Sequence, residues 1–178
     1  MVGNYLIFFV SYFLIVLSVV GHGVLAIKLT KINVSVDEIG FVGLVGIFFL
    51  ILYSYVTHFF ISHGYLHNLI FIFIGLSSIY YFRSKILLKR NFILLFSIFS
   101  TIFLAFIIFK THDDFGYYHF PYSYYINKFS MIIGIGPLNH GFKTPSSIFY
   151  LNSLFYLPYL EYHLYHMGAM LILGFSNI

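Results

Sequence analysis

Long uncharged apolar runs constrain this chain more than any other feature of its sequence. A helix needs about 20 mostly apolar residues to cross the hydrocarbon core of a bilayer. Four stretches meet or approach that length: Val2–Ile27, Phe41–Ile61, Asn68–Phe82 and Phe92–Phe109. A fifth, Ser147–Phe175, is weaker because a proline, a glutamate and two histidines interrupt it. None alternates apolar and polar residues as a barrel strand does. We predict an all-α polytopic transmembrane bundle of four to five spanning helices.

The composition supports a membrane solvent and excludes several classes of protein. Of the 178 residues, 61% are hydrophobic and 8% are charged, whereas soluble domains are roughly 45–50% apolar and about a quarter charged. A water-soluble enzyme and a disordered chain are therefore excluded, and the lack of cysteine excludes a disulfide scaffold. The net charge of +4 is thinly spread, so we expect the lipid bilayer as a partner and no nucleic acid.

Lysines and arginines in the short links predict the orientation of the helices. Lys28 and Lys31 follow the first span, and residues 83–90 hold four basic residues between the third and fourth spans. The link at residues 62–67 has none. Because basic residues are retained on the cytoplasmic side, the first and third links should be cytoplasmic. The N-terminus and the segment 110–146 should then face outward.

The second span begins with glycines that share one side of a helix: Gly40, Gly43 and Gly46. Small residues at such spacing let neighbouring helices approach closely in a membrane. We interpret this strip as a packing surface.

Composition changes at Lys110 and divides the chain into three segments. All four prolines and three of the five acidic residues follow that position. We predict a four-helix scaffold over residues 1–109, an outward acidic and aromatic loop over 110–146, and a fifth membrane or re-entrant helix over 147–178. Seven of the thirteen residues in Tyr117–Phe129 are aromatic. If helical, this stretch should lie along the membrane interface.

The loop begins with two adjacent carboxylates, Asp113 and Asp114. Neighbouring side chains on a helix point about 100° apart. We therefore expect the two carboxylates to have different roles, with one aimed into a cavity and the other anchoring the loop. A helix cap is the alternative role. Tyr117 and Tyr118 follow, either as interfacial anchors or as a platform for a sugar ring or lipid chain.

A glycine-rich stretch, Ile133–Ser147, follows the aromatic segment. It is neither a Walker loop nor a dinucleotide fingerprint, because the required Gly-Lys-Ser/Thr and strand–helix contexts are missing. His140 and Lys143 could offset phosphate charge. Ser146 and Ser147 could donate hydrogen bonds at the start of the next helix, although Ser146 also suits a plain N-cap.

The histidines give no zinc signature. His63 and His67 are four residues apart, and His163 and His166 are three apart, but neither pair has a nearby third ligand. We predict no metal site and no cofactor. The alternative is a hard divalent cation bound mainly by oxygens beside His112 and His119.

Taken together, "HDDFGYYHFP … GIGPLNHGFKTPSSIFYLNSLFYLP" resembles the first large outward loop of GT-C-type polytopic bacterial membrane glycosyltransferases. The resemblance implies an inner-membrane enzyme that transfers sugar from a polyprenyl-phosphate donor to an acceptor on the outward face. It assigns catalysis to Asp113, Asp114 and His119. Substrate-binding residues would be Tyr117, Tyr118, His140, Lys143, Ser146 and Ser147.

Members of that family usually continue with many more membrane helices, whereas this sequence stops at Ile178. We therefore expect the N-terminal part of such an enzyme, a truncated product, or a subunit completed by a membrane partner, and no activity from this chain alone. The competing hypothesis is a non-enzymatic membrane subunit or lipid-carrier-binding protein. A transporter ranks third, since broken helices in matched repeats are missing.

Overall fold

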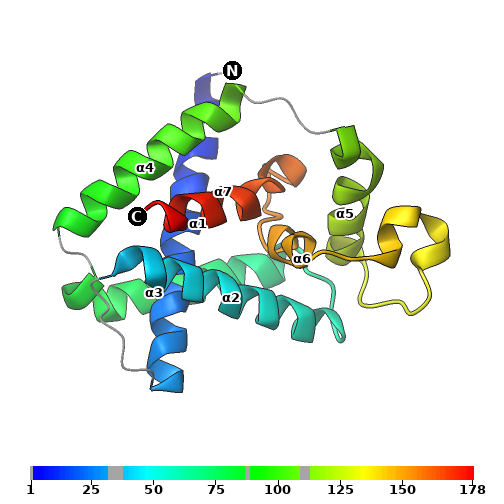
Figure 1. The fold of residues 1–178 in the computed structure, drawn as a ribbon, viewed down its shortest axis with the longest axis horizontal. Helices are drawn as coiled ribbons and strands as arrows, with labels where there is room; N and C mark the ends of the chain where they lie inside the picture. The colour runs from blue at the N-terminus through cyan, green and yellow to red at the C-terminus, as the bar shows by residue number, and fades with distance from the viewer. Residues whose placement is uncertain (1, 32–37, 87–88, 109–112) are drawn as a thin grey trace. The chain divides into compact units, whose positions relative to one another are not determined.

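The structure, a computed structural model, describes residues 2–31, 38–86, 89–108 and 113–178. These residues form α-helices joined by short 3₁₀ and π turns, and none of them belongs to a strand (Figure 1). The α-helices are α1 (Val2–Thr30), α2 (Ile39–His58), α3 (Tyr65–Ile86), α4 (Lys89–Ile108), α5 (Phe120–Lys128), α6 (Ser147–Ser153) and α7 (Met167–Ser176). The all-α prediction is confirmed for this part of the chain.

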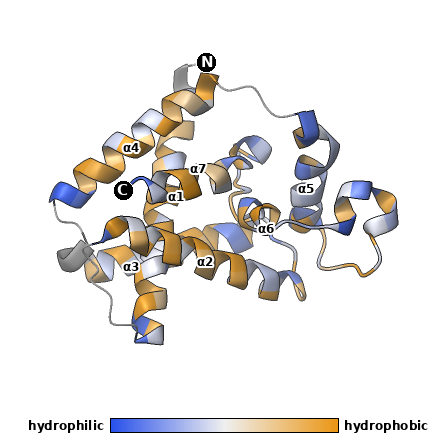
Figure 2. Ribbon diagram, in the orientation of Figure 1, coloured by the Kyte–Doolittle hydropathy of each residue, from blue (hydrophilic) through white to orange (hydrophobic). Residues whose placement is uncertain are grey.

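Three helical segments among the described residues are long and apolar enough to cross a membrane: Tyr5–Thr30, Ile39–His58 and Tyr65–Phe82. They correspond to the first three predicted spans. The fourth predicted span forms α4, whose placement in a membrane stays a prediction. Figure 2 shows hydrophobic residues along most of α1, α2 and α4.

The prediction of one helix over Ser147–Phe175 is wrong. That stretch forms α6 and α7, which have 7 and 10 residues. At 1.5 Å per residue they extend about 10 and 15 Å, too little for a core of about 30 Å. Between them, Pro158 lacks an N–H, and Tyr159 and Glu161 have φ values of 66° and 43°, which a right-handed helix does not allow. The chain turns there instead, with a single β-bridge joining Leu157 and Glu161.

The chain divides into two compact units. Unit 1 comprises Met1–Leu50, Ile70–Phe109 and Ala169–Ile178, and unit 2 comprises Ile51–Leu69 and Lys110–Gly168. One break between the units coincides with the composition change at Lys110. The end of α2, the start of α3 and the link between them, which the sequence suggested were scaffold, belong to the same unit as the acidic loop.

Unit 1 is built on close helix crossings. A Cβ added to Gly21 of α1 would lie 1.8 Å from the Gly75 carbonyl oxygen of α3, and one on Gly46 of α2 would lie 2.1 Å from the Val19 carbonyl oxygen of α1. Only glycine permits backbones to approach so closely. A Cβ on Gly43 would meet the ring of Phe175 at 2.1 Å. The packing role predicted for the glycine strip of α2 is confirmed.

Unit 2 is organised by α5 and α6. Tyr122 and Ile126 of α5 pack in one buried cluster with Phe149 and Tyr150 of α6. The aromatic stretch predicted to lie along the membrane therefore buries part of its apolar surface in protein. Figure 2 shows α5 as more hydrophilic than α1 or α2. This packing fixes the segments on either side of α5, which form the candidate site.

Candidate functional site

A polar cavity of about 560 Å³ lies in unit 2. One part of its wall comes from the π turn at Phe115–His119, and the other from the 3₁₀ turn at His140–Lys143 and the start of α6. Its lining residues are Asp114, Tyr117, Tyr118, His119, His140, Gly141, Thr144, Ser146, Ile148 and Phe149. A carboxylate, two imidazoles and four hydroxyl groups therefore share one hollow.

Asn139 joins the two walls. Its side-chain amide donates a 3.0 Å hydrogen bond to the Tyr117 carbonyl, and its Oδ1 accepts a 2.9 Å bond from the Gly141 N–H. The Asn139 side chain thus acts as the N-cap of the 3₁₀ turn, as short polar side chains commonly do. A Cβ on Gly141 would lie 2.4 Å from the Tyr118 ring, so glycine permits the turn to rest against that ring.

Aromatic rings form an apolar part of the wall. The His119 ring centroid lies 4.4 Å from that of Tyr118 and 5.0 Å from that of Phe149. These three aromatic residues all line the cavity. Polar and apolar contacts are available side by side, as is usual in small-molecule sites.

His166 is a neighbour of this wall that the sequence did not connect with His119. The His166 ring centroid lies 4.2 Å from that of Phe115, which belongs to the same π turn as His119. Burial lowers the pKa of His166, and the nearby His119 lowers it further. The two histidines are far apart along the chain, and the sequence spacing had paired His166 only with His163. Only the tertiary structure reveals the neighbourhood.

Six of the nine predicted site residues line the cavity: Asp114, Tyr117, Tyr118, His119, His140 and Ser146. Asp113, Lys143 and Ser147 are exposed and lie outside its lining. The two carboxylates therefore differ in position, with Asp114 at the cavity and Asp113 outside its lining, while the anchoring role expected for one of them stays a prediction. Ser146 also caps α6, since its Oγ accepts a 3.4 Å hydrogen bond from the Ile148 N–H.

No group of three or more His, Asp or Glu side chains in the described part of the chain could hold a metal ion. His112, which the sequence suggested as a cation neighbour, lies outside the described residues. His63 and His67 stack with ring centroids 4.6 Å apart. Both ring nitrogens of His63 are already hydrogen-bonded, to Ser153 Oγ at 2.7 Å and to Thr57 Oγ1 at 2.9 Å.

A buried polar network, which the sequence reasoning missed, holds the segments of unit 2 together. The side-chain amides of Asn68 and Asn127 donate to the same two carbonyls, those of His63 and Ser153. The Tyr165 hydroxyl donates to Asn127 Oδ1. These contacts connect the α2–α3 link, α5 and the end of α6. Asparagine suits this position because its amide supplies two donors and one acceptor.

His63 is neutral within this network. The side chain is fully buried, and burial lowers its pKa to about 2, with smaller contributions from His67 and His58. A neutral ring carries one N–H, and Ser153 Oγ, whose own proton goes to the Tyr150 carbonyl, can accept a hydrogen bond from it. His63 therefore acts as an uncharged connector in the interior of unit 2.

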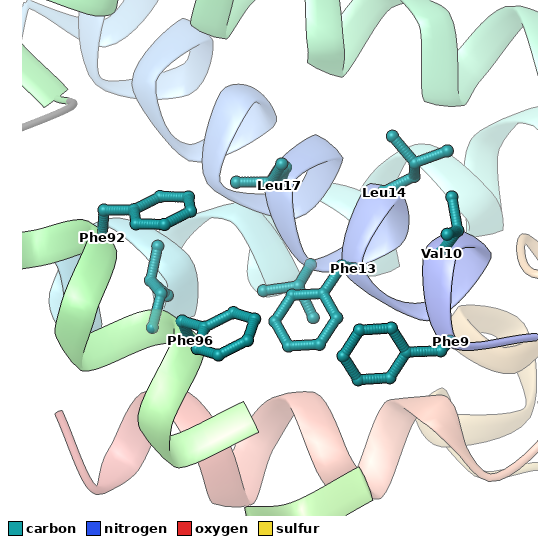
Figure 3. Close-up of a pocket in the computed structure, with 9 residues that line it drawn as sticks. Phe9, Val10, Phe13, Leu14, Leu17, Phe92 and Phe96 are labelled. Carbon is teal, nitrogen blue, oxygen red and sulfur yellow. The ribbon is translucent and has the colours of Figure 1, made fainter. Parts of the chain in front are cut away.

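A second cavity, of about 260 Å³, lies in unit 1 between α1 and α4 (Figure 3). Its lining residues are all apolar: Phe9, Val10, Phe13, Leu14, Val16, Leu17, Phe92, Leu95 and Phe96. No acid, base or hydrogen-bonding side chain is among them. This hollow suits a hydrocarbon group and provides no chemistry of its own.

Comparison with known proteins gives a family. A family model with the description "Domain of unknown function (DUF8201)" matches residues 5–178. The chain belongs to the DUF8201 family. Neither the curated proteins nor the solved structures gave a match. The residues matched to DUF8201 include the apolar helices, the polar cavity and the apolar cavity, so these features all lie within the family region.

Proposed function

We propose that this DUF8201 chain belongs to a GT-C-like membrane glycosyltransferase, acting on the outward face of a bacterial inner membrane with a polyprenyl-phosphate-linked sugar as donor. The polar cavity of unit 2 is the single observation that carries the proposal, because it gathers six residues that the sequence had nominated separately. The proposal includes α4 as a fourth membrane helix and an outward N-terminus.

In this reaction an acceptor hydroxyl attacks the anomeric carbon of the donor sugar. The bond from that carbon to the phosphate oxygen breaks, and polyprenyl phosphate leaves with the electron pair. Asp114, at the cavity, takes the proton of the acceptor hydroxyl as general base. His119 and His140 donate hydrogen bonds to phosphate oxygens, while the Tyr118 ring supports the sugar. Exposed Lys143 would offset phosphate charge at the cavity edge.

A lipid-linked donor combines a polar sugar phosphate with a long hydrocarbon chain. The polar cavity of unit 2 offers contacts for the sugar phosphate. The apolar cavity also favours a second candidate function, a lipid-carrier-binding membrane subunit without catalysis. The two candidate functions differ in one respect: only the enzyme requires the Asp114 carboxylate for glycosyl transfer.

The test uses Asp114→Asn, made in the intact gene, with surface-glycan transfer and polyprenyl-phosphate binding both measured. Loss of transfer with retained lipid binding supports the enzyme. Glu38→Gln is the matched control, because Glu38 is an exposed carboxylate outside unit 2, and transfer should survive it. Asp113→Asn shows which of the adjacent carboxylates acts. Unchanged transfer in both aspartate variants contradicts the proposal.

The non-enzymatic candidate makes a different prediction in the same experiment. The wild-type chain would bind the lipid carrier and copurify with a stoichiometric membrane partner. Asp114→Asn would then leave glycan assembly unchanged, because no proton transfer at this carboxylate is required.

A further inference from the structure

An exposed apolar patch in unit 2 lies at the end of α2. It combines the turn after that helix with the loop after α5, and we call it the Phe60–Ile133 patch. Its members are Phe59, Phe60, Ile61, Phe129, Ile132 and Ile133. Ile133 is 95% exposed and Phe60 is 77% exposed. Large apolar side chains this exposed and this close together mark a contact surface.

Two hydrogen bonds fasten the halves of the patch together. The Met131 N–H donates to the His58 carbonyl at 2.8 Å. His58 Nε2 is hydrogen-bonded to the Phe129 carbonyl at 3.1 Å. Because His58 is the last residue of α2, the loop is fixed at the point where an apolar helix of membrane-spanning length ends.

Several backbone groups of the loop form hydrogen bonds inside the protein. The Phe129 N–H donates to the Tyr125 carbonyl. The Tyr125 hydroxyl accepts from the Ile132 N–H and donates to the Ser130 carbonyl. Each of the four successive residues 129–132 therefore forms at least one hydrogen bond within unit 2 through its backbone. Each of these bonds lowers the cost of placing the loop in lipid, since hydrocarbon offers no hydrogen-bond partner.

The patch continues the outward surface of α2. Leu52 and Val56 are exposed four residues apart on one face of α2, and exposed Phe60 follows in the turn after the helix. Residues 51–62 and 129–138 contain no Asp, Glu, Lys or Arg. In Figure 2 the loop after α5 carries hydrophobic colouring, in contrast to α5 itself. The side of α2 that would face lipid therefore extends onto the patch without a charged residue.

We propose that the Phe60–Ile133 patch is a membrane-contact surface, with the loop Phe129–Ile133 immersed in lipid at the boundary between headgroups and hydrocarbon. The occupant is the bilayer itself, because the patch is continuous with a helix of spanning length and contains no charged residue. The 3₁₀ turn that lines the polar cavity begins at His140, a few residues after the loop. Immersion of the loop would hold the cavity next to the membrane surface.

The chain has no tryptophan and no cysteine. The fluorescence of a single introduced tryptophan, or the labelling of a single introduced cysteine, therefore comes from that position alone. Ile133→Trp and Lys143→Trp are each reconstituted in phosphatidylcholine vesicles with and without brominated acyl chains. Lys143 is the matched control because it is exposed, charged and in the same unit. We expect a blue-shifted emission and strong quenching by brominated lipid at position 133, and weak quenching at position 143.

Equal quenching at the two positions overturns the proposal, as does unquenched, water-like emission at position 133. Blue-shifted emission without lipid quenching means that protein, such as a second copy, covers the patch, and also overturns it. Ile133→Cys and Lys143→Cys provide a second measurement. A membrane-impermeant maleimide should label position 143 at least several-fold faster in vesicles. Because neither experiment involves glycosyl transfer, failure here is distinguishable from failure of the proposed function.

Discussion

Asn127→Asp is the sharpest test of the buried network in unit 2. The change is nearly isosteric, but it replaces the side-chain NH₂, which donates to the His63 and Ser153 carbonyls at 2.7 Å each, with an oxygen. At neutral pH a carboxylate oxygen would face two carbonyl oxygens at hydrogen-bond distance. Asn127 is only 3% exposed, so water cannot relieve the repulsion.

The expected loss follows from these contacts. Each of the two hydrogen bonds contributes about 0.5–1.5 kcal/mol. A buried charge in a broken network costs about 3–5 kcal/mol, even though the Tyr165 hydroxyl can still donate to the other carboxylate oxygen. Together these costs predict that the free energy of unfolding falls by about 4–8 kcal/mol at pH 7. Burial raises the pKa of the introduced carboxyl above its unfolded value of about 3.9. The deficit should therefore be smallest below pH of about 4 and grow as pH rises through the folded pKa.

The measurement is SDS-induced unfolding in mixed detergent micelles, followed by circular dichroism at several pH values. Asn177→Asp is the matched control, because Asn177 is exposed and its amide makes one hydrogen bond, to the Leu173 carbonyl. That variant should stay within about 0.5 kcal/mol of the wild type. A loss below about 1 kcal/mol for Asn127→Asp at pH 7, or a loss that does not depend on pH, would refute the reasoning.

Two further predictions concern packing and pH. In Gly75→Val the new Cβ would lie 2.3 Å from Ser18 Oγ, so we expect α1 and α3 to separate and a loss of about 1–3 kcal/mol. Gly64→Val is the control, since a Cβ at Gly64 meets nothing within 4 Å; equal losses in SDS unfolding would contradict the close-crossing explanation. The second concerns His63, whose pKa falls from about 6.5 unfolded to about 2 on burial. Its contribution is complete above pH 6.5 and declines as pH falls, by about 1.4 kcal/mol between pH 7.5 and 5.5. His63→Gln should flatten this slope, and an unchanged slope in the same titration would show that other groups cause it.

The apolar helices follow from the sequence because their signal is local. Tyr5–Thr30, Ile39–His58 and Tyr65–Phe82 form helices of spanning length, close to the predicted runs, since length and hydropathy are properties of each segment alone. The break between α6 and α7 was harder to predict. Apolar residues continue on both sides of it, and the positive φ values at Tyr159 and Glu161 occur at residues whose type gives no warning.

The candidate site was predictable in its members and not in its arrangement. Asp114, His119 and His140 were nominated by residue type and by a family resemblance, and all three line one cavity. The exclusion of Lys143 from the lining depends on how the 3₁₀ turn rests on Tyr118. The approach of His166 to His119 likewise depends on a fold that brings distant residues together.

By itself, the sequence determined the helical class of this protein and pointed to a membrane. Apolar runs of spanning length suit a lipid environment, and a backbone in lipid must satisfy its own hydrogen bonds, which makes it helical. The tertiary structure decided which polar residues act together. Asn68 and Asn127 lie far apart in sequence yet donate to the same two carbonyls, because buried polar groups take whatever partner the packing provides. Hydropathy is additive along a chain, whereas a shared hydrogen-bond partner exists only once the chain has folded.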